Sequence, residues 1–100
     1  MSKFVYLLKL SESGYYKIGY SKDVRNRINI LKTGNAEEIT LINKYETDYY
    51  KEIETFFHNR YSYKKLNGEC FDLSLEDEFK CLENCQLCEK NLIILQKNKI

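Results

Sequence analysis

Proline and tryptophan are absent from this 100-residue sequence, and glycine occurs four times. Without proline, no predicted helix or strand is interrupted by a residue that lacks a backbone N–H. No apolar run approaches the roughly 20 residues that a membrane-spanning helix needs, and the run after Met1 lacks the length and the cleavage site of a signal peptide. We therefore expect an intracellular protein without a membrane partner, whose four cysteines are reduced.

The charges nearly cancel, because 16 Lys and Arg stand against 15 Asp and Glu. Their distribution is uneven: residues 1–65 contain twelve basic and eight acidic side chains, whereas residues 66–100 contain four and seven. A phosphate-bearing partner should therefore meet the first two-thirds of the chain. With 43% hydrophobic residues, residues 1–100 are predicted to form one globular domain around a single core, which excludes a disordered chain.

Two short β-rich runs near the N-terminus predict a hairpin. They are Phe4–Lys9 and Tyr15–Tyr20, and a cluster of turn-forming residues separates them. Ser21 is then predicted to cap a helix in which apolar residues recur at helical spacing. Gly34 is predicted to end this helix in the left-handed conformation.

A third strand over Glu38–Tyr45 and a second helix over about 49–62, capped by Asp48, complete the predicted core. A loop and a short extended piece follow at 66–73. The order ββαβα, then an extended segment and a final helix, predicts an α+β domain. Its sheet should be small, central, mainly antiparallel and three-stranded, with helices flanking it.

The last helix is predicted to begin at a capping box formed by Ser74 and Asp77. It should run to about Lys90 or beyond, and the tail Ile93–Ile100 either extends it or packs as a terminal strand. Helical spacing predicts a buried side made of Leu75, Phe79, Leu82, Cys85 and either Leu87 or Cys88.

Three of the four cysteines lie on this last helix. Cys81, Cys85 and Cys88 occupy positions i, i+4 and i+7, and Cys70 precedes them. The spacing favours a buried stripe, because free cysteine packs as a small hydrophobic residue. A zinc site is the alternative interpretation, since Cys85 and Cys88 have the spacing of half a zinc-binding motif.

The second β-rich run directs two sets of side chains to opposite faces of the sheet. Tyr16, Ile18 and Tyr20 share one face, and Lys17 and Gly19 share the other. Strand packing explains most of the nine tyrosines. Lys17 is either a solvated strand residue or the neighbour of another catalytic residue across the hairpin.

Charged residues on the first two predicted helices are further candidates for a functional site. Arg25 and Arg27 lie on the first turns of the helix after Ser21. Each of these side chains is either a solvated charge or a guanidinium that contacts the sheet. Glu54 and His58 are four residues apart on the second helix and therefore share a face. Such a pair either binds a metal ion together or forms a structural hydrogen bond.

These residues together resemble the GIY-YIG endonuclease superfamily, and more closely its short phage- and virus-type branch. Phe4-Val5-Tyr6 and Lys17-Ile18-Gly19 correspond to the two motifs for which the family is named. Arg27 stands eight residues after the glycine, at the family's spacing.

The resemblance continues on the second predicted helix. Glu54 stands four residues before His58, as in the phage-type branch, and Gly68-Glu69-Cys70-Phe71 matches the Gly-x-x-Phe run of that branch. The resemblance covers about residues 3–75, so 76–100 would form a helical extension. The first motif lacks its glycine and isoleucine, and Lys17 replaces the tyrosine of the second motif.

The resemblance implies a metal-dependent endonuclease that hydrolyses DNA. Glu54 would bind one divalent ion, Mg²⁺ or Mn²⁺, Arg27 would hold a non-bridging phosphate oxygen, and Tyr6 would take a proton from the attacking water. Lys17 would assist the loss of the phenolic proton, and His58 would orient water or serve as an alternative base. DNA contacts are expected from Tyr16, Tyr20, Lys22 and Arg25.

Two other functions fit the same sequence. One is a nucleic-acid-binding or regulatory module that keeps the fold without cleaving, which Lys17 and the near-neutral charge favour. The other is an interaction domain in which zinc bridges the cysteines. A nuclease this short has no room for a separate DNA-reading module, so sequence specificity is expected to be low or to come from a homodimer or a partner protein.

Overall fold

The computed structural model of this protein describes residues 1–34, 37–67 and 70–98. Within them, five antiparallel strands form one sheet in the order β3-β1-β2-β5-β4. The predicted α+β class is confirmed, and two short strands, β4 and β5, widen the expected three-stranded sheet. The elements are β1 (Lys3–Leu10), β2 (Tyr16–Ser21), α1 (Val24–Thr33), β3 (Ile39–Thr47), α2 (Tyr50–Arg60), the 3-10 helix η1 (Ser62–Lys64), β4 (Lys65–Asn67), β5 (Cys70–Phe71) and α3 (Leu75–Lys97).

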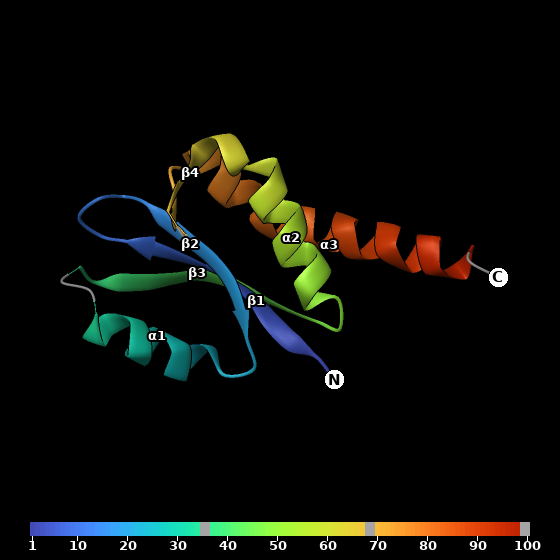
Figure 1. Ribbon diagram of the computed structural model, residues 1–100, viewed down its shortest axis with the longest axis horizontal. Coiled ribbons are helices and arrows are strands. Elements are labelled where there is room, and N and C mark those ends of the chain that lie inside the picture. The colour runs from blue at the N-terminus through green and yellow to red at the C-terminus, as the bar shows by residue number, and fades with distance from the viewer. Residues whose placement is uncertain (35–36, 68–69, 99–100) are drawn as a thin grey trace.

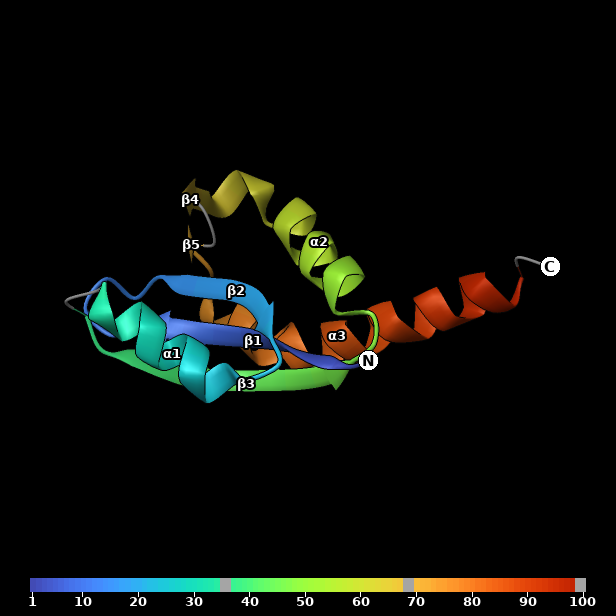
Figure 2. The same cartoon turned by 60° about the horizontal axis from the view of Figure 1, so that its bottom comes forward.

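The helices cover both faces of the sheet (Figure 1 and Figure 2). α1 packs on one face, where Val24 joins Tyr6, Leu8 and Leu10 in a small core cluster. α2 and α3 share the other face. Because side chains alternate along a strand, β1 and β2 also contribute to this larger cluster, which contains Val5, Leu7, Tyr16 and Ile18 of the sheet and Ile53, Phe57, Cys81 and Cys85 of the helices.

The N-terminal hairpin has the predicted strands, within a residue or two at each end. Gly14 in its turn has a φ of 75°, a conformation that glycine adopts without strain. The register pairs Tyr6 with Gly19 and Leu8 with Lys17. The side chains of Tyr6 and Lys17 therefore lie on the same face of the sheet, the one that carries α1.

Both predicted caps of α1 are wrong. The helix is capped by Asp23, whose side chain accepts a hydrogen bond of 3.1 Å from the Asn26 backbone N–H. Ser21 forms a turn with Asp23 instead, because its hydroxyl is close enough to bond the backbone two residues ahead. Gly34 has a φ of −104°, so it does not adopt the left-handed conformation.

The start of α2 also differs from the predicted one. Tyr49 occupies the N-cap position and makes no side-chain cap. Thr47 Oγ1 accepts a hydrogen bond of 3.0 Å from the Tyr49 backbone N–H, a bond that Thr side chains commonly make two residues ahead. Asp48 lies 3.9 Å from the amino group of Met1 instead.

The capping box predicted for the last helix is confirmed, since Ser74 and Asp77 exchange side-chain-to-backbone hydrogen bonds. α3 then continues to Lys97, so the C-terminal tail extends the helix and forms no strand within the described residues. Its last turns project beyond the sheet (Figure 1). In the described part of the chain, no helix is both long and apolar enough to cross a membrane.

The buried side of α3 is only partly the predicted one. Cys81 and Cys85 are buried against the sheet and α2, and Cys88 and Leu92 pack beside them. The cysteine stripe is therefore confirmed as part of the core, where small side chains allow the helix to approach closely. The large apolar residues predicted to be buried are exposed instead: Leu75, Phe79, Leu82 and Leu87.

Candidate active site

The Tyr6 phenol lies between the sheet and α1, where Arg27 reaches it. Tyr6 has 2% of its surface exposed, and its partner across the hairpin is Gly19, which carries no side chain. Val24 anchors the first turn of α1 in the core, and Arg27 lies three residues later on the same side of the helix. Arg27 Nε donates a hydrogen bond of 3.3 Å to the Tyr6 hydroxyl oxygen, and this contact brings the predicted base and the predicted phosphate ligand together.

Lys17 lies on the same face of the sheet, but its ammonium contacts a different group. β5 pairs Cys70 with Lys17, and Lys17 Nζ lies 3.3 Å from Cys70 Sγ. The cation that contacts the Tyr6 hydroxyl is therefore the Arg27 guanidinium. No local pattern could have indicated the Lys17–Cys70 contact, because the two residues are 53 positions apart.

α2 is attached to β2 through His58. In the described part of the chain, β5 pairs with Tyr16 and Lys17 of β2. The backbone carbonyl of the following residue of β2, Ile18, lies 3.0 Å from His58 Nε2. Because a carbonyl only accepts, Nε2 carries the hydrogen and donates it. The opposite nitrogen, Nδ1, is therefore the atom through which neutral His58 could accept a proton.

The position of Glu54 follows from the direction of α2. The rings of Tyr50 and Tyr20 are 4.8 Å apart, and His58, two turns later, contacts the carbonyl described above. The helix therefore runs antiparallel to β2, and Glu54 lies midway between these contacts. This places Glu54 level with Gly19, where the two motif strands pair.

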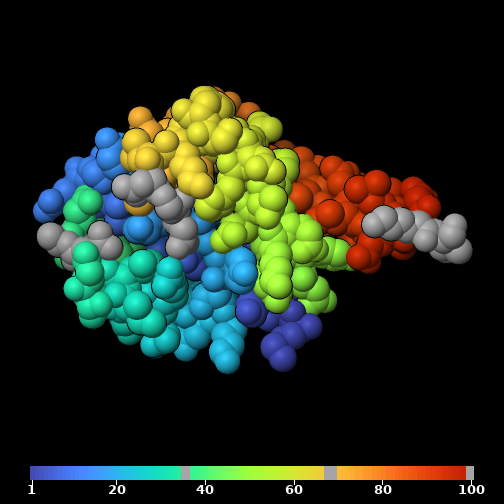
Figure 3. Space-filling view, in the orientation of Figure 1, coloured from blue at the N-terminus to red at the C-terminus, as the bar shows by residue number. Residues whose placement is uncertain are grey.

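The predicted catalytic residues thus surround one strand. Tyr6 and Arg27 approach β2 from the side of α1, and Glu54 and His58 approach it from α2. Figure 3 shows the surface of β2 between α1 and α2.

Glu54 is the residue near β2 whose carboxylate could hold a hydrated divalent ion. Mg²⁺ is commonly bound by one or two carboxylates and keeps several of its waters, and Glu54 offers such oxygen ligands from a half-buried position. No group of three or more His, Cys, Asp or Glu side chains in the described residues is arranged to hold a metal ion. The described residues therefore provide no zinc site made of four protein ligands.

Two cysteines of α3, Cys85 and Cys88, are also poor zinc ligands for an electrostatic reason. Zinc binds thiolates, whereas the hydrogen bond that Cys85 donates to Cys81 and burial raise the pKa of the Cys85 thiol. The same bond lowers the pKa of Cys81, which accepts it. Burial raises the pKa of Cys88. Cys70 is separate from both and lies on β5, so the zinc-bridged alternative has no ligand set among the described residues.

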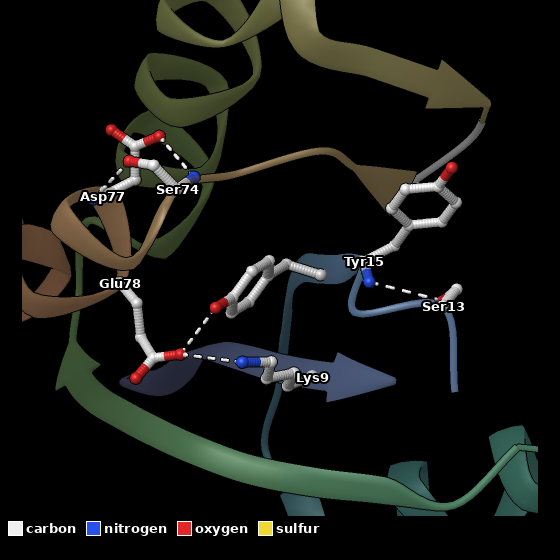
Figure 4. Close-up of polar contacts among 7 residues, drawn as sticks. Lys9, Ser13, Tyr15, Ser74, Asp77 and Glu78 are labelled. Atoms are coloured by element: carbon white, nitrogen blue, oxygen red, sulfur yellow. Dashed lines mark hydrogen bonds and ion pairs between the residues drawn. The ribbon is translucent and has the colours of Figure 1, made fainter. Parts of the chain in front are cut away.

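Tyr16, predicted to contact DNA, lies in the core. Its side chain is 1% exposed, its hydroxyl donates a hydrogen bond of 2.6 Å to Glu78 Oε1 on α3, and Lys9 Nζ lies 3.8 Å from the same oxygen. Figure 4 shows Lys9 directed at Glu78. Burial and the hydrogen bond to Glu78 raise the pKa of Tyr16 to about 12. The residue therefore anchors α3 to the sheet and has little surface left for a ligand.

The other predicted DNA contacts are at or near the surface. Lys22 and Arg25 are exposed at the start of α1. Tyr20 is half-buried against Tyr50, and Lys3 Nζ lies 5.4 Å from its ring centroid. Sequence reasoning missed Lys3, although its place opposite the end of the second motif strand was a usable signal.

Comparison with known proteins identifies one matching family. The family model described as the T5orf172 domain matches residues 3–88, which include the motif strands, α1, α2 and the first part of α3. This domain is associated with nucleases of the GIY-YIG and homing-endonuclease types and indicates a nuclease or DNA-binding role. No curated protein and no solved structure matches the chain.

Proposed function

This chain belongs to the T5orf172 domain family, and we propose that it is a divalent-metal-dependent endonuclease that hydrolyses DNA phosphodiester bonds through a GIY-YIG-like site of the short phage type. The contact between Tyr6 and Arg27 carries the proposal. It joins a group able to take a proton with a cation able to bind phosphate, on the strand pair that carries both motifs.

The proposed reaction is attack of water on phosphorus. Tyr6, as the phenolate, accepts a proton from the attacking water, and the Arg27 guanidinium offsets the negative charge of its oxygen. Arg27 has five N–H donors, so it can hold Tyr6 through Nε and a non-bridging phosphate oxygen through its terminal nitrogens. The new bond joins the water oxygen to phosphorus while the bond to the 3′ oxygen breaks.

Glu54 and His58 have different proposed roles. A divalent ion bound through Glu54 supplies stabilisation of the negative charge on the phosphate and on the leaving oxygen. His58 donates to the Ile18 carbonyl, which fixes α2 against β2 and thereby positions the Glu54 carboxylate. Lys17 keeps its predicted role only if its ammonium leaves Cys70.

A DNA-binding or regulatory module without cleavage is the second candidate, and the burial of Tyr6 favours it. A general base has to come within hydrogen-bond distance of the water that it activates, and almost none of the Tyr6 side chain is exposed. Cleavage therefore requires that the residues around Tyr6 move when DNA binds. Lys22 and Arg25 would bind phosphates in either case.

The test is cleavage of supercoiled plasmid by the full chain in Mg²⁺ or Mn²⁺. We expect nicked and linear products that disappear when the metal is chelated. Arg27→Ala and Glu54→Gln should each lower the rate by about a hundredfold or more. Lys32→Ala and Glu52→Gln, which change exposed residues on the same two helices, should leave it nearly unchanged.

The outcomes separate the two candidates. Nicking by Arg27→Ala and Glu54→Gln at the rates of their controls would overturn the proposed site. Binding of fluorescent DNA without cleavage in either metal would establish the binding module instead. The Arg27 side chain contacts a buried residue, so its removal could also affect folding. Far-UV circular dichroism of Arg27→Ala therefore has to show a folded protein before its rate is compared.

A further inference from the structure

α3 carries a second apolar stripe that the rest of the chain leaves exposed. Leu75, Phe79, Leu82 and Ile93 are all exposed, and Phe79 has 79% of its surface exposed. Their spacing places them on one side of the helix, about a third of a turn from the cysteine stripe. Single exposed apolar residues are common on protein surfaces, but Leu75, Phe79 and Leu82 on successive turns indicate an interaction surface. Gln86 and Glu89 separate them from Ile93 on the same side.

Four charged residues border this apolar stripe at intervals of seven. Glu76 and Glu83 come first, and Lys90 and Lys97 follow; all four side chains are exposed. A seven-residue interval keeps them on the same side of a helix. Lys80 pairs with Glu76 at 2.9 Å within the same helix, so the border is only net acidic in the N-terminal half of α3 and is basic in the C-terminal half.

We propose that α3 pairs in antiparallel orientation with α3 of a second copy, so that the protein forms a homodimer. With the twofold axis crossing the middle of the charged border, Glu83 of one copy meets Lys90 of the other, and Glu76 meets Lys97. Because of the twofold symmetry, each of these contacts occurs twice in the dimer. The same register brings Leu82 of one copy against Ile93 of the other.

Other occupants fit this surface less well. In a parallel pair, each charged border residue would lie beside the same residue of the second copy, so like charges would meet across the interface. DNA would meet a region of net negative charge, since residues 66–100 contain seven acidic and four basic side chains. The 23 residues of α3 provide roughly 35 Å of helix for the pairing.

The first test is the molar mass of the full chain, measured by light scattering during size-exclusion chromatography. We expect twice the chain mass of 12.0 kDa at micromolar concentrations, and a monomer for Phe79→Asp. Leu87→Asp is the matched control, because Leu87 is also exposed on α3 but lies off the stripe, and it should remain dimeric. A monomeric wild type throughout this range, or equal loss of the dimer in both variants, would overturn the proposal.

The second test examines the antiparallel orientation by exchanging charges. Glu83→Lys and Lys90→Glu should each raise the dimer dissociation constant about tenfold, because two attractive contacts become repulsive. The double variant should restore wild-type affinity, and a mixture of the two single variants should form heterodimers. If the double variant is as weak as the single ones, the antiparallel arrangement is wrong.

Carbodiimide cross-linking gives a direct measure of the same contact. A zero-length link between Glu83 and Lys90 should join two chains, because these residues are about 10 Å apart along one helix and cannot link within it. Mass spectrometry should find this peptide in the dimer band. A dimer band that contains only other linked pairs would contradict the proposed register.

Discussion

Tyr16→Phe removes one hydroxyl from the contact that attaches α3 to the sheet. The ring remains, so the packing of this buried residue is kept. Glu78 loses a donor at 2.6 Å and retains Lys9 at 3.8 Å. A hydrogen bond to a charged group contributes about 1.5–3 kcal/mol. We expect the free energy of unfolding at neutral pH to fall by an amount near the lower end of that range, because Lys9 still partly compensates the half-buried carboxylate.

The same contact predicts how the effect depends on pH. The pKa of Tyr16 is raised to about 12 by burial and by the bond to Glu78, whereas a tyrosine in the unfolded chain titrates near 10. The folded state therefore holds the phenolic proton more tightly, and this stabilisation is complete below pH ~10 and is lost as the pH rises towards ~12. Since Phe cannot ionise, the difference in stability between wild type and Tyr16→Phe should shrink over that window.

Urea unfolding followed by far-UV circular dichroism measures both effects. Tyr63→Phe is the matched control, because Tyr63 is 78% exposed and its hydroxyl should contribute less than about 0.5 kcal/mol. A loss in Tyr16→Phe no larger than in Tyr63→Phe would refute the anchoring role. A difference that stays constant up to pH ~12 would refute the argument from the pKa.

Two further predictions concern the cap of α1 and the cysteines. Asp23→Ala should lower the free energy of unfolding by about 1 kcal/mol, whereas Asp23→Asn keeps a capping oxygen and should lower it only slightly; urea unfolding compares the two, and equal losses would contradict the cap. Chelation of divalent metals should leave the melting temperature unchanged, because Cys81 and Cys85 are packed in the core; a lower melting temperature in EDTA would show that a metal supports the fold.

The parts of the fold that could be predicted from sequence are those in which local pattern and final contacts agree. The hairpin combines two β-rich runs with a glycine at positive φ, and the capping box at Ser74 and Asp77 is a local signal that tertiary contacts leave intact. The caps of α1 and α2 were wrong because several Ser, Thr and Asp residues stand near each helix start. Backbone geometry decides which of them reaches a free N–H.

The sequence suggested candidate residues for the site but not the contacts that they make. Tyr6 and Arg27 meet as the motif spacing suggests. The contact of Lys17 with Cys70 depends on β5, a strand of two residues, which is too short to leave a sequence pattern. The hydrogen bond between His58 and the Ile18 carbonyl could not be predicted from the sequence either, because every residue offers the same backbone acceptor.

α3 shows why an apolar pattern alone could not identify the buried side of a helix. The helix has two apolar stripes, and the sequence does not say which neighbour covers each. Its rotation is fixed by two carboxylates eleven positions apart: Glu78 accepts from Tyr16, and Glu89 accepts from Tyr45 and Thr47. A helix held at both points presents its small cysteines to the sheet and cannot turn to bury Phe79 as well. The large stripe is thereby left outside the monomer, where pairing with a second copy would remove it from water.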